Sequence, residues 1–155
     1  MNDKKTIPLD YANGLIYELE KAFWDERGRG ARFRMTTVGR QYYRERIRPA
    51  LEAPDLEQIL KTVQATLESE GIAGQVSYDQ DGRLLRLTVK GCLHGQVEDR
   101  MTSHGIEPFT CVPANLIVLA VEEKLDRPIE LAEIKKDENG CHLLLVLFDK
   151  RPSLD

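Results

Sequence analysis

The sequence predicts an α+β fold: an antiparallel sheet built from two β-hairpins, packed against helices, with further helices at the N-terminus. Two observations support this prediction. Apolar residues recur at helical spacing over the first 70 residues, and they then alternate in two pairs of short segments separated by turn residues. Hairpins joined by helices favour one antiparallel sheet. The expected order is three helices, a hairpin, two helices and a second hairpin.

Three helices are expected in the first half of the chain. Residues 10–25 contain Leu15, Leu19, Ala22 and Phe23 at helical spacing, and residues 36–52 form the second expected helix. The third begins at Asp55, where the apolar residues follow the i, i+3, i+4, i+7 pattern closely. The segment 26–34 contains two glycines and four arginines, which is typical of a loop.

Two hairpins and two helices are expected in the second half. The first hairpin turns at residues 79–82, and a loop with a small helix follows between residues 92 and 104. An apolar helix over residues 111–125 is expected to be buried, with Thr110 as its cap. The second hairpin turns at Asn139-Gly140. Its last strand, 141–148, is apolar on both faces and is expected to be central.

Composition excludes several classes of protein. The chain has 155 residues, 41% of them hydrophobic and 31% charged, which fits one globular domain and not a disordered segment. The net charge of −4 gives no general attraction to nucleic acid. No apolar run reaches the length of a transmembrane helix, and the N-terminus does not resemble a signal peptide. Three cysteines without a close pair indicate a reducing, cytoplasmic location.

The cysteines and histidines are confined to one part of the chain. All six lie between residues 92 and 142, and each cysteine stands at the boundary of an expected element. Cysteine and histidine are the ligands that zinc and iron prefer. The alternative is that the thiols are ordinary buried side chains. The residues are Cys92, Cys111, Cys141, His94, His104 and His142.

Cys111 has a second possible role. A thiol in the first turn of a helix meets free N–H groups and the positive end of the dipole, which are expected to lower its pKa. It could then act as a metal thiolate or as a nucleophile. A nucleophile needs a base within hydrogen-bond reach, and the spacing of the three histidines selects none of them.

A basic segment precedes the third helix. Arg40, Arg44 and Arg48 recur at every fourth position, so they share one helix face that could bind an anion. The alternative is a solvated face paired with acidic residues elsewhere. Arg40 and the nearby aromatic Tyr43 are the candidate ligand-binding residues, because an aromatic side chain beside an apolar pocket suits a flat ligand.

The region 36–149 resembles the 4-vinyl reductase family, also called hydrocarbon-binding domains. The order of elements agrees with that family better than any single motif does. The resembling segments are Thr37-Val38-Gly39-Arg40-Gln41-Tyr42, Glu70-Gly71-Ile72-Ala73-Gly74, Lys90-Gly91-Cys92-Leu93-His94, Pro108-Phe109-Thr110-Cys111 and Asn139-Gly140-Cys141, with Glu133 in the strand between the last two. The chain then divides into an N-terminal helix and arginine-rich loop, 1–35, and a ligand-binding domain, 36–150.

The resemblance implies a homodimer formed through N-terminal helices and an apolar ligand pocket. Family members that sense aromatic compounds hold zinc near the pocket, and their ligand positions correspond to Cys111, Glu133 and Cys141. The family's further cysteine is missing here, since Lys135 and Lys136 stand in its place. A four-coordinate zinc would then need Cys92, His94 or His142. The alternatives to zinc are an iron–sulfur cluster on the three cysteines and a bound tetrapyrrole.

The expected function is that of a small-molecule binding protein. The ligand is hydrophobic, aromatic or tetrapyrrole-like, and the protein acts as a carrier or as a sensor or accessory subunit, with a possible metal site. No partnership with nucleic acid or membrane is expected. One alternative is a cysteine- or metal-dependent enzyme, although no G-x-G-x-x-G stretch for a dinucleotide is present. The other is a scaffold protein whose arginine face is an interface.

Overall fold

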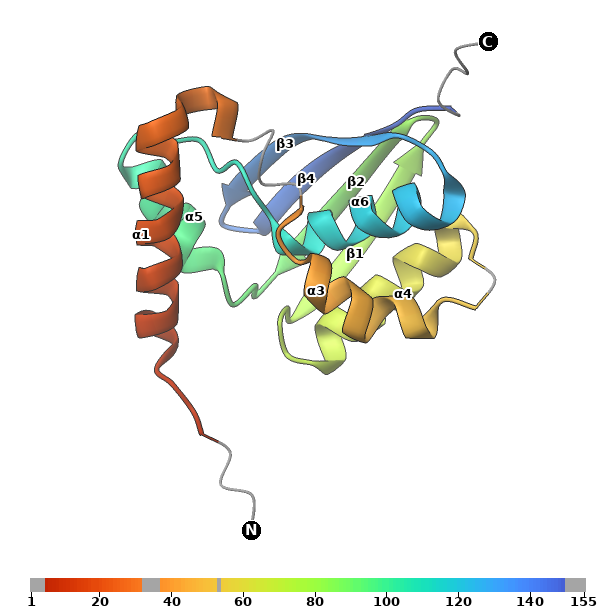
Figure 1. Ribbon diagram of the computed structural model, residues 1–155, viewed down its shortest axis with the longest axis horizontal. Coiled ribbons are helices and arrows are strands. Elements are labelled where there is room, and N and C mark those ends of the chain that lie inside the picture. The colour runs from red at the N-terminus through yellow and green to blue at the C-terminus, as the bar shows by residue number, and fades with distance from the viewer. Residues whose placement is uncertain (1–4, 32–36, 53, 150–155) are drawn as a thin grey trace.

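The structure is a computed structural model that describes residues 5–31, 37–52 and 54–149. It contains helices and one four-stranded antiparallel sheet, which confirms the predicted α+β class (Figure 1). The predicted boundary between residues 35 and 36, and the arginines at 32 and 34, lie outside the described residues.

The two hairpins join through their inner strands. The sheet order is β1-β2-β4-β3, so β2 pairs with β4 at the centre, and the prediction that the last strand is central is confirmed. The first turn lies later than predicted, because residues 79–81 still pair within the first hairpin. The strands are β1 (Gln75–Asp81), β2 (Leu84–Lys90), β3 (Ile129–Asp137) and β4 (Gly140–Leu147).

Two helices cover one face of the sheet. They are α4 (Leu56–Ser69) and α6 (Val112–Leu125), and Figure 1 shows them side by side in front of the strands. The N-cap of α4 is Asp55, as predicted; its Oδ1 accepts a hydrogen bond of 2.8 Å from the backbone N–H of Gln58. Because α6 is apolar nearly all round, it is buried among the sheet, α4 and the preceding helical turns.

The start of α6 differs from the prediction. Cys111 occupies the N-cap position, and no side chain caps the helix. Thr110 instead accepts a hydrogen bond of 3.3 Å from the amide of Asn115, inside the fold. Because Cys111 is 8% exposed, its thiol meets protein atoms and not solvent.

The region predicted as one helix over residues 36–52 consists of three short helical segments. They are α3 (Arg40–Tyr42), a π-helical turn η3 (Tyr43–Ile47) and a 3-10 turn η4 (Arg48–Ala50). Gly39 stands directly before α3 with φ of 100°, a left-handed conformation that a regular right-handed helix does not contain. Pro49 lies in the first turn of η4 and disfavours a regular helix through Arg48, the residue before it.

A second, smaller core lies at one end of the sheet. Here α1 (Leu9–Arg27), followed by η1 (Gly28–Gly30), packs beside α5 (Gly95–Ser103), as Figure 1 shows. Of the stripe predicted for α1, Leu15, Leu19 and Ala22 are exposed, whereas Phe23 packs against the second core. The face toward α5 contains polar and aromatic side chains, namely Asn13, Tyr17, Glu20 and Trp24.

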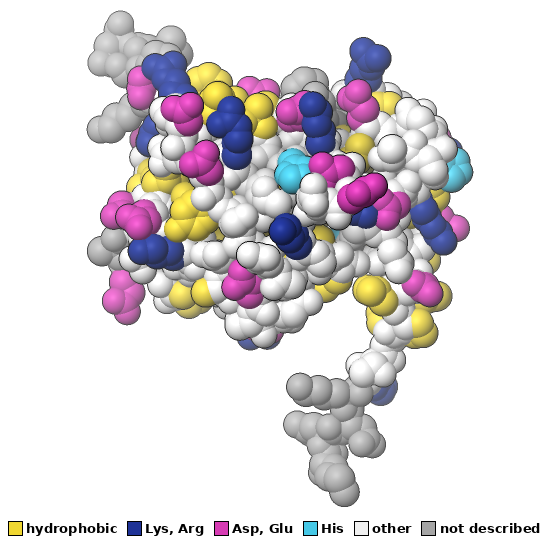
Figure 2. All heavy atoms as spheres, turned by 180° about the vertical axis from the view of Figure 1, so that it is seen from behind, with side chains coloured by type: hydrophobic (Ala, Val, Ile, Leu, Met, Phe, Trp, Pro, Cys, Tyr) yellow, Lys and Arg dark blue, Asp and Glu magenta, His cyan; other side chains and the backbone are white. Residues whose placement is uncertain are grey.

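The other face of the sheet has no helix over it among the described residues. Figure 2 views the molecule from this side, where lysine, arginine and acidic side chains are scattered over the surface. Alternate residues of β4 on this face are half-buried, whereas their neighbours in the strand belong to the core. Within the described part of the chain, no helix is both long and apolar enough to cross a membrane.

Candidate functional site

One hollow of the described structure lies between the second core and strand β3. Its volume is about 830 Å³, within the range of small-molecule sites. Ile106 and Phe109 line one side, and Leu131 and Ile134 of β3 line the other. We call it the first hollow. Charged side chains, Arg29 and Glu133 among them, line it as well, so the hollow suits a hydrophobic molecule that also carries polar groups.

Two aromatic rings form one wall of the first hollow. Trp24, near the end of α1, stacks on Phe109 with ring centroids 5.6 Å apart and an angle of 24° between the planes. Trp24 is half-buried, so part of its surface stays accessible. Neither ring belongs to the ligand-binding residues predicted from the sequence. They are 85 residues apart, and only the packing of α1 on α5 brings them together.

A second hollow of about 470 Å³ adjoins the first. Lys136 and Asp137 line both, and Cys92 and Cys141 line the second. Lys136 ties the surrounding elements together, because its Nζ pairs with Asp99 at 2.6 Å and donates to the carbonyl of Gly95 at 3.2 Å. The second hollow therefore opens where β3, β4 and α5 meet.

The three cysteines lie in one neighbourhood. Cys111 and Cys141 belong to the main core, and Cys92 packs against it. All three are free thiols. Burial raises the pKa of Cys111 well above its usual value, and the charges of Glu98, Cys92 and Cys141 raise it further. The three sulfur atoms are thus close enough to influence one another's ionisation.

The predicted low pKa of Cys111 is wrong. Burial is the larger effect: it outweighs the hydrogen bond with the backbone of Ala114, which lowers the pKa, and keeps the thiol protonated. Burial also raises the pKa of Cys141, to about 12, and that of Cys92. Without a bound cation, none of the three is expected to be an activated nucleophile, which weakens the interpretation as a cysteine enzyme.

We expect alkylation of the metal-free protein to follow exposure. Iodoacetamide at pH 8 should label Cys92 several-fold faster than Cys141 and Cys111, because Cys92 is half-buried whereas the other two are buried. Peptide mass spectrometry at timed intervals measures the three rates. Preferential labelling of Cys111 would restore the nucleophile hypothesis.

A buried carboxyl group lies in α5. Glu98 is 8% exposed, and its Oε2 has no hydrogen-bond partner among the described residues. Burial raises the pKa of Glu98 to about 7. The charge of Glu98 in turn raises the pKa of each cysteine. The sequence gives no signal for this residue, because a glutamate in a short polar helix is normally solvated.

Glu133 does not join the cysteines. It pairs across the strands with Leu144, whereas Ile134 pairs with Leu143 on the covered face. A β-bulge between Leu131 and Glu133 causes this, since one extra residue turns every later side chain to the opposite face. The carboxylate is exposed and forms an ion pair of 2.9 Å with Lys135.

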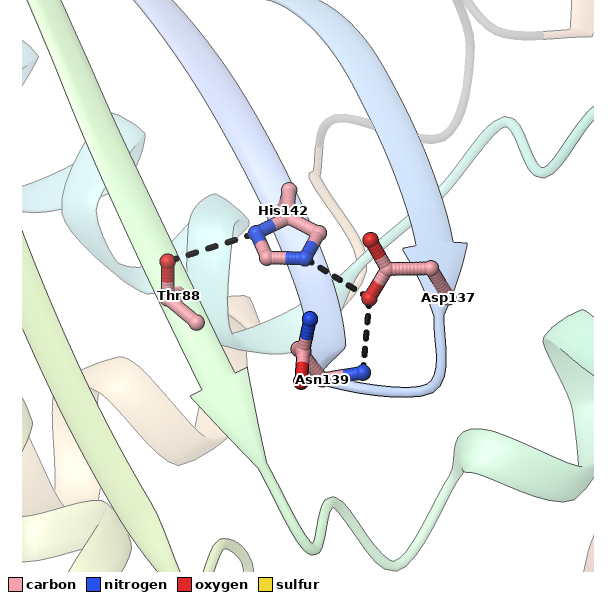
Figure 3. A network of polar contacts seen from close by, with 4 residues as sticks. All are labelled: Thr88, Asp137, Asn139 and His142. Carbon is pink, nitrogen blue, oxygen red and sulfur yellow. Dashed lines mark hydrogen bonds and ion pairs between the residues drawn. The ribbon is translucent and has the colours of Figure 1, made fainter.

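His142 is also directed away from the thiols. Figure 3 shows its ring on the open face of the sheet, with Nε2 2.9 Å from Oδ1 of Asp137 and Nδ1 3.4 Å from Oγ1 of Thr88. The same Asp137 oxygen accepts the backbone N–H of Asn139 at 2.7 Å. The hydrogen bond from His142 lowers the pKa of Asp137. This network fixes the turn of the second hairpin.

The remaining candidates lie at different places. His94, at the start of α5, is half-buried, its Nδ1 has no partner among the described residues, and burial lowers its pKa. His104 is exposed at the end of α5. Arg40 is exposed and Tyr43 is buried in the main core, and neither lines either hollow. Arg48 pairs with Glu123 at 2.7 Å, so the arginine face is partly neutralised.

The side chains as they stand do not form a completed metal centre. Within the described ranges, no three cysteine, histidine, aspartate or glutamate side chains are positioned to hold one ion. A search of protein-family models and a search of curated proteins each found no match to this chain. The resemblance to hydrocarbon-binding domains therefore stays a prediction, and the site has to be interpreted from its own chemistry.

Proposed function

We propose that the chain binds a flat, hydrophobic molecule in the first hollow, beside a metal ion held by the thiols, as a carrier or accessory subunit. The observation that supports this most is the hollow itself, of about 830 Å³, with the stacked rings of Trp24 and Phe109 in its wall. Aromatic rings offer a planar ligand a large contact area, and offset stacking adds about 0.5–1.5 kcal/mol beyond burial. An aromatic compound or a tetrapyrrole has the required shape.

The metal part of the proposal is supported by Cys92 and Cys141, which line the second hollow, and by Cys111, which belongs to the same core as Cys141. Three thiolates and one oxygen or nitrogen ligand suit zinc, which prefers four-coordinate tetrahedral sites. An iron–sulfur cluster suits this chain less, because clusters usually take four cysteines and the sequence has three. Bound zinc would lower the pKa of each thiol and neutralise the thiolates that burial disfavours.

Trp24 allows a direct test, because it is the only tryptophan of the chain. We expect naphthalene and protoporphyrin IX, titrated separately, to quench its emission in a saturable way. Replacing Phe109 by leucine keeps an apolar side chain but removes the ring, so the dissociation constant should rise about two- to tenfold. Fluorescence titration, corrected for absorbance of the probe, gives these values.

The matched control is Phe148→Leu. Phe148 is exposed beyond the end of β4 and does not line the first hollow, so this variant should bind like the unsubstituted protein. Failure of both probes to quench Trp24 would contradict ligand binding in the first hollow. Equal weakening by both substitutions would show that the probes bind elsewhere.

The homodimer predicted through N-terminal helices stays a prediction. Helix α1 and the residues before it expose large apolar side chains, and Figure 2 shows hydrophobic atoms gathered where the described chain enters this helix. Ile7, Tyr11, Leu15 and Leu19 recur at every fourth position and are 45–71% exposed. This is the surface that a second copy would cover.

A further inference from the structure

Two opposite charges line the first hollow without a partner in the protein. Six charged side chains line this hollow, and four of them have a charged or histidine partner at 2.6–2.9 Å. The side chains of the other two, Arg29 and Glu107, have no ion-pair or hydrogen-bond partner in the described part of the chain. A ligand with charges of both signs would supply these partners. The four paired side chains are Glu133, Lys135, Lys136 and Asp137.

Arg29 is carried on a turn whose two ends are fixed. Gly28, with φ of 58°, turns the chain at the end of α1, and its backbone N–H donates to the carbonyl of Trp24. At the other end, the backbone N–H of Ala31 donates to the carbonyl of Gly28, and Ala31 is fully buried in the second core. The turn η1 therefore holds the backbone of Arg29 beside the same hollow that Trp24 lines.

Glu107 lies on a segment that is fixed in a similar way. It stands between Ile106 and Phe109, which are both buried in the second core. The backbone N–H of Ile106 also donates to the carbonyl of Met101, at 2.9 Å. Each ring of the stacked pair therefore has one of the two unpaired charges close to it along the chain.

We propose that the ligand of the first hollow is a planar aromatic molecule with both a carboxylate and a protonated amine, which is the chemistry of an aromatic amino acid. The ring of the ligand contacts Trp24 and Phe109, the carboxylate pairs with Arg29, and the amine pairs with Glu107. A guanidinium suits the carboxylate, because its planar donors match the two oxygens. This inference rests on the proposed function, from which it takes the hollow and the rings and to which it adds the class of ligand.

Four probes that share one ring system separate the two charges. Naphthylalanine has both groups, naphthylpropionate has the carboxylate alone, naphthylethylamine has the amine alone, and naphthylethanol has neither. Each is titrated into the full chain at neutral pH by isothermal titration calorimetry. We expect each matching charge to tighten binding about two- to fivefold, because Arg29 and Glu107 are exposed and solvent-accessible ion pairs gain little. Naphthylalanine should therefore bind most tightly and naphthylethanol least.

Two substitutions assign each charge of the ligand to its partner. Arg29→Gln should weaken naphthylalanine and naphthylpropionate about two- to fivefold, but not naphthylethylamine. Glu107→Gln should weaken naphthylalanine and naphthylethylamine by a similar factor, but not naphthylpropionate. The matched control is Arg27→Gln, which removes the same charge from an exposed side chain that does not line the hollow, so all four affinities should stay unchanged. Thermal unfolding establishes that each variant is folded.

The outcomes distinguish this inference from the proposed function. Binding of naphthylethanol as tightly as naphthylalanine overturns the inference and leaves the hydrophobic site intact. An advantage from only one of the two charged groups also overturns it, and so does equal weakening of naphthylalanine by Arg27→Gln and Arg29→Gln. Absence of binding by all four probes contradicts both the inference and ligand binding in the first hollow.

Discussion

Replacing Gly140 by alanine is expected to destabilise the protein by about 3 kcal/mol or more, a large part of the 5–15 kcal/mol that holds a typical domain. Gly140 begins β4 with φ of 119°, a conformation that costs other residues about 1–3 kcal/mol. An added Cβ would also lie 2.5 Å from the carbonyl oxygen of Val89, in the backbone of the paired strand. Neither strand can move without breaking the central pairing of the sheet.

Gly82 provides the matched control, because it turns the first hairpin with φ of 59° and a Cβ there would meet nothing within 4 Å. Alanine at that position should cost only about 1–2 kcal/mol, the penalty of the left-handed conformation. Urea unfolding of both variants, compared by midpoint and slope, measures the difference. Similar losses at the two positions would contradict the argument from the close contact with Val89.

The elements that sequence analysis predicted well are those with strong local signals. Helix α4 has regular apolar spacing and a capping aspartate, Asp55. The second hairpin has the Asn139-Gly140 pair, which favours a tight turn, and its last strand is apolar enough to be central. In each case the residues within one short segment decide the structure, so neighbouring elements do not need to be known.

The orientation of α1 could not be predicted in this way. Its exposed side contains Leu15 and Leu19, whereas its packed side contains Asn13 and Glu20. Because Ile16 and Phe23 lie on the packed side at helical spacing, hydrophobic periodicity alone does not choose between the two faces. The choice depends on α5, whose own sequence is short and polar, and on the contact that buries Glu98 there. The carboxyl group was therefore missed together with the helix packing that buries it.

The placement of the candidate metal ligands has a similar explanation. Cys111 and Cys141 belong to one core and Cys92 packs against it, because each cysteine stands at the end of an element and those ends meet. Strict alternation from Ile129 through Leu131 would place Glu133 on the covered face of the sheet. The bulge at Ala132 moves it to the open one. A bulge of one residue has no clear signal in the sequence, yet it decides which face of the sheet the Glu133 carboxylate takes.

Removing the charge of Glu20 is expected to stabilise the metal-free protein at pH 8 but not at pH 4. Burial, and to a smaller extent the neighbouring carboxyl of Glu98, raise the pKa of Glu20 to about 7. Glu20 lies on the packed side of α1, facing α5, where Glu98 has Lys136 and Asp99 as its own charged neighbours. Both glutamates are therefore expected to be largely neutral in the folded protein below pH 7.

The direction of the pH dependence follows from the raised pKa. Below about pH 4.5, Glu20 is protonated in both the folded and the unfolded chain, so its full contribution to stability is present. Between pH 4.5 and 7, the unfolded chain releases the proton first, and the free energy of unfolding falls as the pH rises. Once the pH is above the pKa of Glu20 in the folded protein, a shift of this size has lowered the free energy of unfolding by about 3 kcal/mol. Glutamine at this position cannot ionise, so Glu20→Gln should lose less stability over that range.

The neighbouring Glu18 separates this effect from a general change in charge. Glu18 is exposed on the same helix, so Glu18→Gln removes the same charge without relieving a buried one. Thermal unfolding of both variants and the unsubstituted protein, in the presence of a chelator from pH 4 to pH 8, should show a rising advantage for Glu20→Gln alone. An advantage independent of pH would mean that the ionisation of Glu20 does not oppose the packing of α1 on α5.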